Sequence, residues 1–126
     1  MASEDVDIEC ISAVTVFVAD MARTVRFYTA LGFPLIYGGE DAPFSSFRAG
    51  TGYVNTARGQ APTTLWGRTI VYVSDVDAMH RRVLAAGYTP AMAPADAPWG
   101  ERYFHVCDPD GNELSFARPL TGGAID

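Results

Sequence analysis

The chain has 126 residues, of which 48% are hydrophobic and 19% charged, and its formal net charge is −6 at pH 7. This length and composition predict one soluble globular domain with a hydrophobic core of its own. The excess of acidic side chains argues against nucleic acid and anionic membrane surfaces, because binding to either needs Lys and Arg. It mildly favours a cationic partner.

The first nine residues are acidic and lack the basic start and apolar run of a secretory signal. No apolar stretch approaches the ~18 residues of a membrane span. Cys10 and Cys107 are far apart and show no paired spacing, which predicts reduced thiols. We therefore expect a cytoplasmic protein.

The first predicted strand, residues 14–18, is a run of β-branched and aromatic residues with little solvent exposure. Asp20 follows as the N-cap of a helix over residues 21–31, and Gly32 stands where a left-handed C-cap is wanted. Apolar residues at helical spacing give this helix one buried stripe. Short strands are expected at 34–37, 45–48 and 53–56.

Residues 68–88 repeat residues 13–33, with identical residues at pairs such as Val16/Val71 and Asp20/Asp75. The second copy predicts a strand at 70–73, a helix capped by Asp75, and strands at 89–92, 102–107 and 113–117. The sequence Asp-Pro-Asp-Gly at 108–111 is a strong turn signal between the last two strands. A repeat of this length predicts an α+β fold built from two tandem βαβββ modules.

The expected organisation is a single domain over 1–126. Module one covers about 11–57, a linker covers 58–67, module two covers 68–118, and residues 119–126 form a loose tail. The second copy carries extra residues in the region 93–100.

A strand, an Asp, a helix and Leu-Gly-Phe follow one another in the first copy, and the second copy repeats this order. Asp-Pro-Asp-Gly-Asn precedes the last strand. In this order of motifs the chain resembles the glyoxalase/bleomycin-resistance/extradiol-dioxygenase group. These are the vicinal oxygen chelate proteins, and the resemblance covers about residues 11–118. It implies two βαβββ modules whose sheets curl around a central groove. It also commonly implies a homodimer.

In the metalloenzymes of this group, a His on the first strand and a carboxylate on the last strand of a module hold a divalent metal. The corresponding positions here are Ala13 and Arg68 on the first strands, and Asn55 and Ser115 on the last strands. Ala binds no metal, Arg repels one, and Ser and Asn are weak neutral ligands. The resemblance therefore implies a member without a metal or other cofactor, although Glu113 could stand in for a shifted ligand.

Strand alternation predicts which side chains line the groove. The candidates are Ala13, Thr15, Phe17, Phe47, Tyr53, Asn55, Arg68, Ile70, Tyr72, Glu113 and Ser115. An aromatic and apolar cavity with few polar groups is typical of a small-molecule site, although these rings could also fill a barrel core. Glu113 is the neighbour expected to neutralise Arg68.

Two histidines are present, and we expect His80 on the second helix to be structural. Tyr103 and His105 alternate with Phe104 and therefore line the groove if Phe104 faces the helices. An edge or surface position for His105 is the alternative.

Trp99 lies in a Pro-Trp-Gly segment just before a strand, which places a rigid aromatic side chain at the groove mouth. This segment is similar to that of the antibiotic-sequestering bleomycin-resistance proteins. The leading hypothesis is a metal-independent protein that binds a small aromatic or heteroaromatic compound, such as an antibiotic or metabolite. The alternative is a glyoxalase- or dioxygenase-type enzyme, with a metal whose ligands are shifted or with His105 and Glu113 in acid–base roles.

Overall fold

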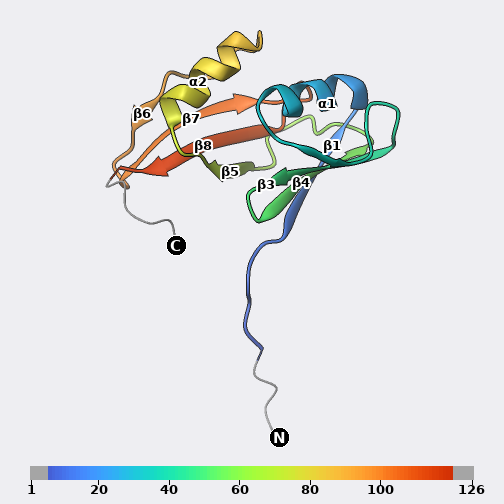
Figure 1. The fold of residues 1–126 in the computed structure, drawn as a ribbon, viewed down its shortest axis with the longest axis horizontal. Coiled ribbons are helices and arrows are strands. Elements are labelled where there is room, and N and C mark those ends of the chain that lie inside the picture. Colours follow the sequence, from blue (N-terminus) through green and yellow to red (C-terminus); the bar gives the residue numbers. More distant parts are fainter. Residues whose placement is uncertain (1–5, 121–126) are drawn as a thin grey trace, which may run out of the picture.

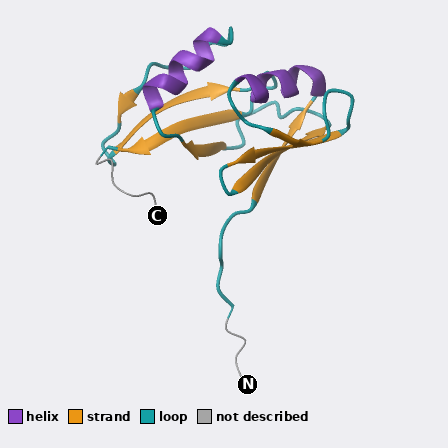
Figure 2. Ribbon diagram, in the orientation of Figure 1, coloured by secondary structure: helices purple, strands orange, loops and turns teal. Residues whose placement is uncertain are grey.

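The computed structural model describes residues 6–120 and contains two similar halves, each with one helix above one sheet (Figure 1). The elements in chain order are β1 (Ala13–Val18), α1 (Met21–Ala30), β2 (Leu35–Tyr37), β3 (Phe44–Ala49), β4 (Gly52–Arg58), β5 (Arg68–Tyr72), α2 (Val76–Ala85), β6 (Ala95–Asp96), β7 (Glu101–Cys107) and β8 (Glu113–Pro119). Figure 2 shows both helices on the same side of the two sheets.

The two sheets have the same topology. Their strand orders are β1-β4-β3-β2 and β5-β8-β7-β6. The first and last strands of each module are parallel neighbours, and the other pairs are antiparallel. The predicted α+β fold of two tandem βαβββ modules is confirmed, and the two sheets are not closed on each other. Neither helix within residues 6–120 has the length and apolar character needed to cross a membrane.

The predicted helix caps are confirmed. The side chain of Asp20 accepts a hydrogen bond from the Arg23 amide at 3.2 Å, and that of Asp75 accepts one from the Ala78 amide at 3.0 Å. Each bond satisfies an amide of the first turn that has no partner within its helix. Gly32, just after α1, has a φ of 102°, which other residues rarely adopt.

The hydrophobic core lies between the helices and the sheets and runs through both modules. Phe27 of α1 packs edge-on against Tyr88, which follows α2, with ring centroids 4.8 Å apart. Phe33 and Phe116 also meet across the modules, at 6.1 Å. His80 packs edge-on against Phe104 at 5.0 Å, which is a structural contact. One face of each sheet is therefore covered by the core, and the other face is open.

The predicted strand at residues 89–92 is wrong. This segment contains Pro90 and connects to β7 through one backbone hydrogen bond, from the Ala91 amide to the His105 carbonyl at 2.9 Å. Pro90 has no N–H and cannot contribute to a ladder of bonds. The short strand β6 forms instead at Ala95–Asp96, in the region expected to be an insert.

The β7–β8 turn does more than reverse the chain, because it joins module two to module one. The buried Asp108 carboxylate accepts a hydrogen bond from the Tyr28 hydroxyl of α1 at 2.8 Å. Asn112 donates to Asp108 at 3.1 Å and to the Phe17 carbonyl of β1 at 3.1 Å. The indole N–H of Trp66, from the linker, donates to Asn112 at 3.1 Å. These buried polar groups satisfy one another across the module boundary.

Burial raises the pKa of Asp108 above its ordinary value, and the hydrogen bonds from Asn112 and Tyr28 oppose part of that rise. Asp110 of the same turn adds an ion pair with Arg23 of α1 at 2.7 Å. The turn therefore holds the two modules through both neutral and charged contacts. The predicted tail covers residues 119–126. Pro119 is the last residue of β8, and residues 121–126 lie outside the described part of the chain.

Candidate ligand-binding site

The open face of the second sheet carries most of the predicted site residues. On β8, Leu114 and Phe116 are buried in the core, so Ser115 between them points to the opposite side. The same argument on β7 places Phe104 in the core and His105 on the open side, as predicted. We call this surface the second open face, and its side chains are Arg68, Ile70, Tyr72, Glu101, Tyr103, His105, Cys107, Glu113, Ser115 and Ala117.

Arg68 and Glu113 begin neighbouring parallel strands and form an ion pair, with Arg68 Nε 2.6 Å from Glu113 Oε1. Glu113 is thus the neutralising neighbour that the sequence led us to expect. The pair occupies the start of the two strands and leaves no net charge there.

His105 lies beside Ser115 in the middle of this face, since the two residues are register partners on β7 and β8. Its Nδ1 atom is buried and has no hydrogen-bond partner among the described residues. Burial lowers the pKa of His105, the positive charge of Arg68 lowers it further, and Glu113 partly opposes both. The lowered pKa favours the neutral form of His105 at pH 7.

Glu101 is a site residue that the sequence reading missed. Its two carboxylate oxygens accept hydrogen bonds from the Trp99 indole N–H, at 2.9 Å, and from the Tyr72 hydroxyl. The Tyr72 side chain reaches across β8 to make this contact, because β8 lies between β5 and β7. The alternation that indicated Tyr103 and His105 extends to Glu101, two residues before Tyr103, and would have identified it.

Trp99, Tyr103 and His105 form a row of rings along β7. The ring centroids of Trp99 and Tyr103 are 5.5 Å apart, and those of Tyr103 and His105 are 5.1 Å apart. Trp99 is 66% exposed and sits in a turn over residues 97–100, closed by a hydrogen bond from the Gly100 amide to the Ala97 carbonyl at 3.0 Å. This turn presents a large planar side chain to solvent.

The first sheet has a corresponding open face, which carries Phe17, Tyr53 and Asn55. Asn55 donates weakly to Thr15 at 3.4 Å, and the guanidinium of Arg48 lies 5.3 Å from the centre of the Tyr53 ring. Arg48 was not predicted, although it pairs with Tyr53 in register. We call this surface the first open face, and its side chains are Ala13, Thr15, Phe17, Ser46, Arg48, Tyr53 and Asn55.

Phe47, which we expected in the groove, lies in the core instead. It is fully buried, and its ring is 5.2 Å from that of Tyr28 on α1. Its register partner on β4 is Val54, which is also buried. Phe47 therefore shares the helix-covered face, and the neighbouring residue Arg48 takes the open side.

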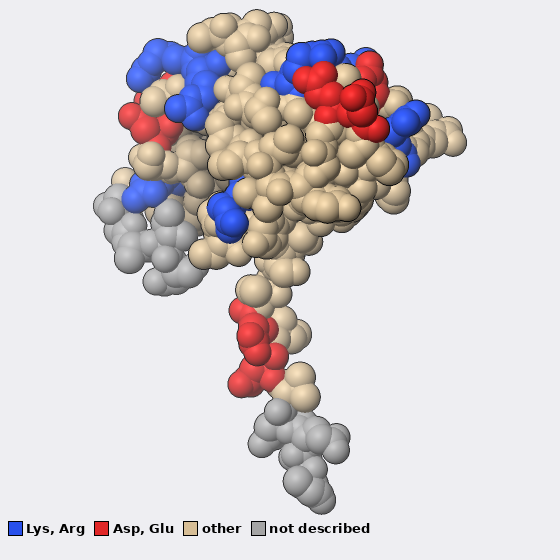
Figure 3. Space-filling view, turned by 45° about the vertical axis from the view of Figure 1, so that its right-hand side comes forward, with Lys and Arg blue, Asp and Glu red and all other residues tan. Residues whose placement is uncertain are grey.

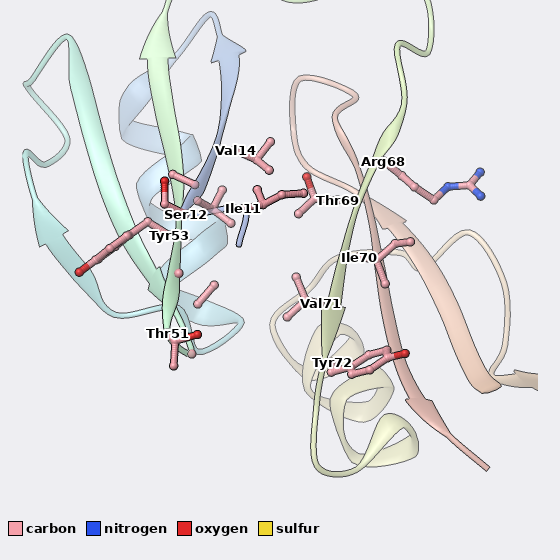
Figure 4. A pocket seen from close by; sticks show the side chains of 15 residues that line it. Ile11, Ser12, Val14, Thr51, Tyr53, Arg68, Thr69, Ile70, Val71 and Tyr72 are labelled. Atoms are coloured by element: carbon pink, nitrogen blue, oxygen red, sulfur yellow. The ribbon is translucent and has the colours of Figure 1, made fainter. Parts of the chain in front are cut away.

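A cavity of about 650 Å³ separates the facing edges of the two sheets, β1 and β5. Figure 4 shows Val14, Thr69 and Val71 between the sheets, whereas Tyr53 and Arg68 point away from the gap on opposite sides. Predicted groove residues from both modules nevertheless line this cavity, namely Ala13, Tyr53, Arg68, Ile70 and Tyr72. Phe17, Asn55 and the candidates on β7 and β8 are not among the described residues that line it.

The four positions at which the group's metalloenzymes carry ligands do not fit a metal here. Ala13 has no donor atom in its side chain. Asn55 does not lie opposite Ala13, because its register partner on β1 is Thr15, two residues farther along the strand. In module two, Arg68 places a positive charge at the start of β5. Its ion pair with Glu113 occupies the carboxylate that could otherwise bind a metal. Across residues 6–120, no three His, Cys, Asp or Glu side chains come together in a metal-binding arrangement. Cys107 is a free thiol whose pKa is raised by burial, and this makes thiolate ligation less favourable.

Comparison with known proteins agrees with this architecture. The chain is 39% identical over 66 residues to an uncharacterized protein of Mycobacterium bovis, a match that covers 50% of this chain and 43% of that protein. The chain thus spans less than half the length of the curated relatives it matches.

Solved structures match over much more of the chain. TioX from Micromonospora sp. ML1 is 29% identical with a TM-score of 0.73, and the match covers 89% of this chain and 100% of TioX. A bleomycin-binding protein crystallised with bleomycin is 21% identical with a TM-score of 0.72, over 88% of this chain and 98% of that protein.

A family model gives the assignment. The model described as "Glyoxalase/Bleomycin resistance protein/Dioxygenase superfamily" matches residues 11–116, which span both modules. The chain belongs to the glyoxalase/bleomycin resistance protein/dioxygenase superfamily.

Proposed function

We propose that this protein binds a flat aromatic or heteroaromatic small molecule on the second open face and holds it without chemical change. The observation that carries the proposal is the row of Trp99, Tyr103 and His105, which exposes ring faces beside oriented polar groups. Exposed aromatic side chains with a few fixed polar atoms are the usual composition of a small-molecule site. The same fold holds bleomycin in the bleomycin-binding protein, so the fold is compatible with this use.

The proposal includes binding without a metal. The Arg68–Glu113 ion pair occupies the strand start from which a family metalloenzyme would present a ligand. A permanently charged guanidinium at that point repels a divalent cation. Ligand affinity therefore comes from stacking and hydrogen bonds.

We also propose that the site is completed in a homodimer. The open faces of both sheets lie on the side opposite the helices, and both expose large apolar side chains such as Phe17, Ile70 and Tyr72. Residues 6–10 extend away from the body, with Val6 and Ile8 exposed and Asp7 and Glu9 following them in turn (Figures 1 and 3). A second copy whose first open face covers the second open face of its partner would bury these surfaces and enclose the ligand.

Sedimentation velocity tests the dimer. We expect the wild-type protein to sediment with twice the 13.6 kDa mass of one chain, and Phe17→Glu to sediment as a monomer with weakened ligand binding. Leu84→Glu is the matched control, because Leu84 is equally exposed but lies on α2, away from both open faces. A wild-type protein that stays monomeric at concentrations where it binds its ligand would contradict the dimer.

Titration with a broad panel of planar aromatic compounds tests the binding function. Trp99 is exposed beside Tyr103, so a stacked ligand is expected to quench or shift tryptophan emission in a saturable way. At least one flat heteroaromatic compound should give this saturable response. The same compound should be recovered chemically unchanged after the titration. A panel that gives no saturable response, or a ligand that is converted to product, would contradict the proposal.

A further inference from the structure

Glu101 stands out on the second open face as a carboxylate without a cationic partner. Both of its oxygens accept hydrogen bonds, from the Trp99 indole and the Tyr72 hydroxyl, which are neutral donors. No arginine within residues 6–120 forms an ion pair with it. Neutral donors stabilise the ionised carboxylate without cancelling its charge, and two of its four lone-pair positions stay free.

The groups around Glu101 do not neutralise it either. Arg102, the next residue, points to the helix side, where it pairs with Asp77 at 3.0 Å and Asp96 at 2.8 Å. Arg68 is paired with Glu113, and the lowered pKa of His105 favours its neutral form at pH 7. Among the described residues of a single chain, the second open face therefore carries one uncompensated negative charge, located at Glu101.

Aromatic rings flank this charge. Trp99 donates its N–H to Glu101 and also packs against Tyr103, so a ligand ring that stacks on this pair lies next to the carboxylate. Ring faces attract a cation as well, because the π system is electron-rich. A carboxylate joined to exposed aromatic faces favours a positively charged group and disfavours an anionic one.

We propose that Glu101, Trp99 and Tyr72 form a cation subsite, which receives a protonated amine or guanidinium carried by the aromatic ligand. This inference rests on the proposed function and narrows its ligand class to cationic heteroaromatic compounds. Glu101 supplies the charge, Trp99 supplies the stacking surface, and Tyr72 fixes the direction of the carboxylate. The hydrogen bond to Glu101 raises the pKa of Tyr72, which keeps the hydroxyl protonated as a donor.

The test compares two probes of the same shape, 9-aminoacridine, which is cationic near neutral pH, and acridine, which is neutral there. Glu101→Gln removes the charge and keeps an oxygen that can accept a hydrogen bond. We expect this variant to bind 9-aminoacridine about fivefold more weakly by calorimetry, the effect of one partly exposed ion pair, and to bind acridine as the wild type does.

Glu40→Gln is the matched control for long-range attraction. Glu40 is exposed near α1, pairs with Arg26 at 3.0 Å, and its replacement changes the net charge by the same amount. We expect Glu40→Gln to bind both probes as the wild type does. Equal weakening in the two variants, or equal weakening of both probes by Glu101→Gln, would overturn the cation subsite.

Two further outcomes separate this inference from the proposed function. If the wild type binds both probes and Glu101→Gln binds them equally well, the cation subsite is overturned and the binding function stands. If the wild type binds neither probe nor any compound of the panel, both are overturned. Sedimentation of Glu101→Gln is measured beside the titrations, so that the affinities of variant and wild type are compared at concentrations where both have the same mass.

Discussion

Replacement of Asp108 by Ala is expected to lower the free energy of unfolding by about 3–5 kcal/mol, since it leaves several buried donors without an acceptor. The Asp108 carboxylate accepts hydrogen bonds from the Tyr28 hydroxyl and the Asn112 amide groups, and all three residues are nearly fully buried. Water cannot replace these bonds without opening the boundary between the modules. Urea denaturation followed by circular dichroism measures the loss.

Two companion variants show whether this loss comes from the buried hydrogen bonds. Tyr28→Phe removes one donor and one contact, so a smaller loss of about 1–2 kcal/mol is expected. Asp41→Ala removes an exposed carboxylate and should change stability by less than about 0.5 kcal/mol. If Asp108→Ala were no more damaging than Asp41→Ala, the turn would not be what holds the two modules together.

Replacement of Trp99 by Ala should weaken binding of the aromatic ligand by about tenfold to a hundredfold, because a large stacked ring is lost. Trp99 is 66% exposed, and its indole donates to Glu101 and to no other residue within 6–120, so the fold should tolerate the change. Calorimetry is the appropriate measurement, because the substitution removes the fluorescent reporter.

Two variants calibrate the Trp99 result. Trp99→Phe keeps a stacking ring and should lose less affinity than Trp99→Ala. Leu84→Ala shortens an exposed apolar side chain on α2 and should bind as the wild type does. Full affinity in Trp99→Ala would show that the ligand lies elsewhere on the protein.

Local features of the fold were predictable from the sequence because neighbouring residues determine them. The caps Asp20 and Asp75 depend on contacts three residues away, and both were predicted correctly. The strand expected at residues 89–92 failed for a local reason as well, because it contains Pro90 and is followed by Pro94, and neither can donate a backbone hydrogen bond.

The arrangement of the site depends on contacts that sequence alternation does not describe. Alternation shows which residues share a face of one strand, but it does not fix the angle between the two sheets. Tyr53 and Arg68 both line the cavity between the sheets, but their side chains point away from it on opposite sides, which alternation could not predict. The Tyr28–Asp108 bond joins positions 80 residues apart, and no local pattern predicts such a contact.

Phe47 and Glu101 illustrate the two kinds of error. Phe47 was predicted to line the groove, and its register with Val54 shows that it belongs to the core. Glu101 was overlooked because its role depends on Tyr72, which reaches it across an intervening strand. Side-chain reach of this kind is a tertiary property.

The most direct test of metal-independent binding is a titration of the dialysed protein with its aromatic ligand, in the presence and absence of EDTA, with the metal content of the same sample measured. The account predicts one saturable curve with the same dissociation constant in both conditions, and no stoichiometric Fe, Ni, Zn or Mn. Binding that is lost in EDTA and restored by one of these ions would contradict it.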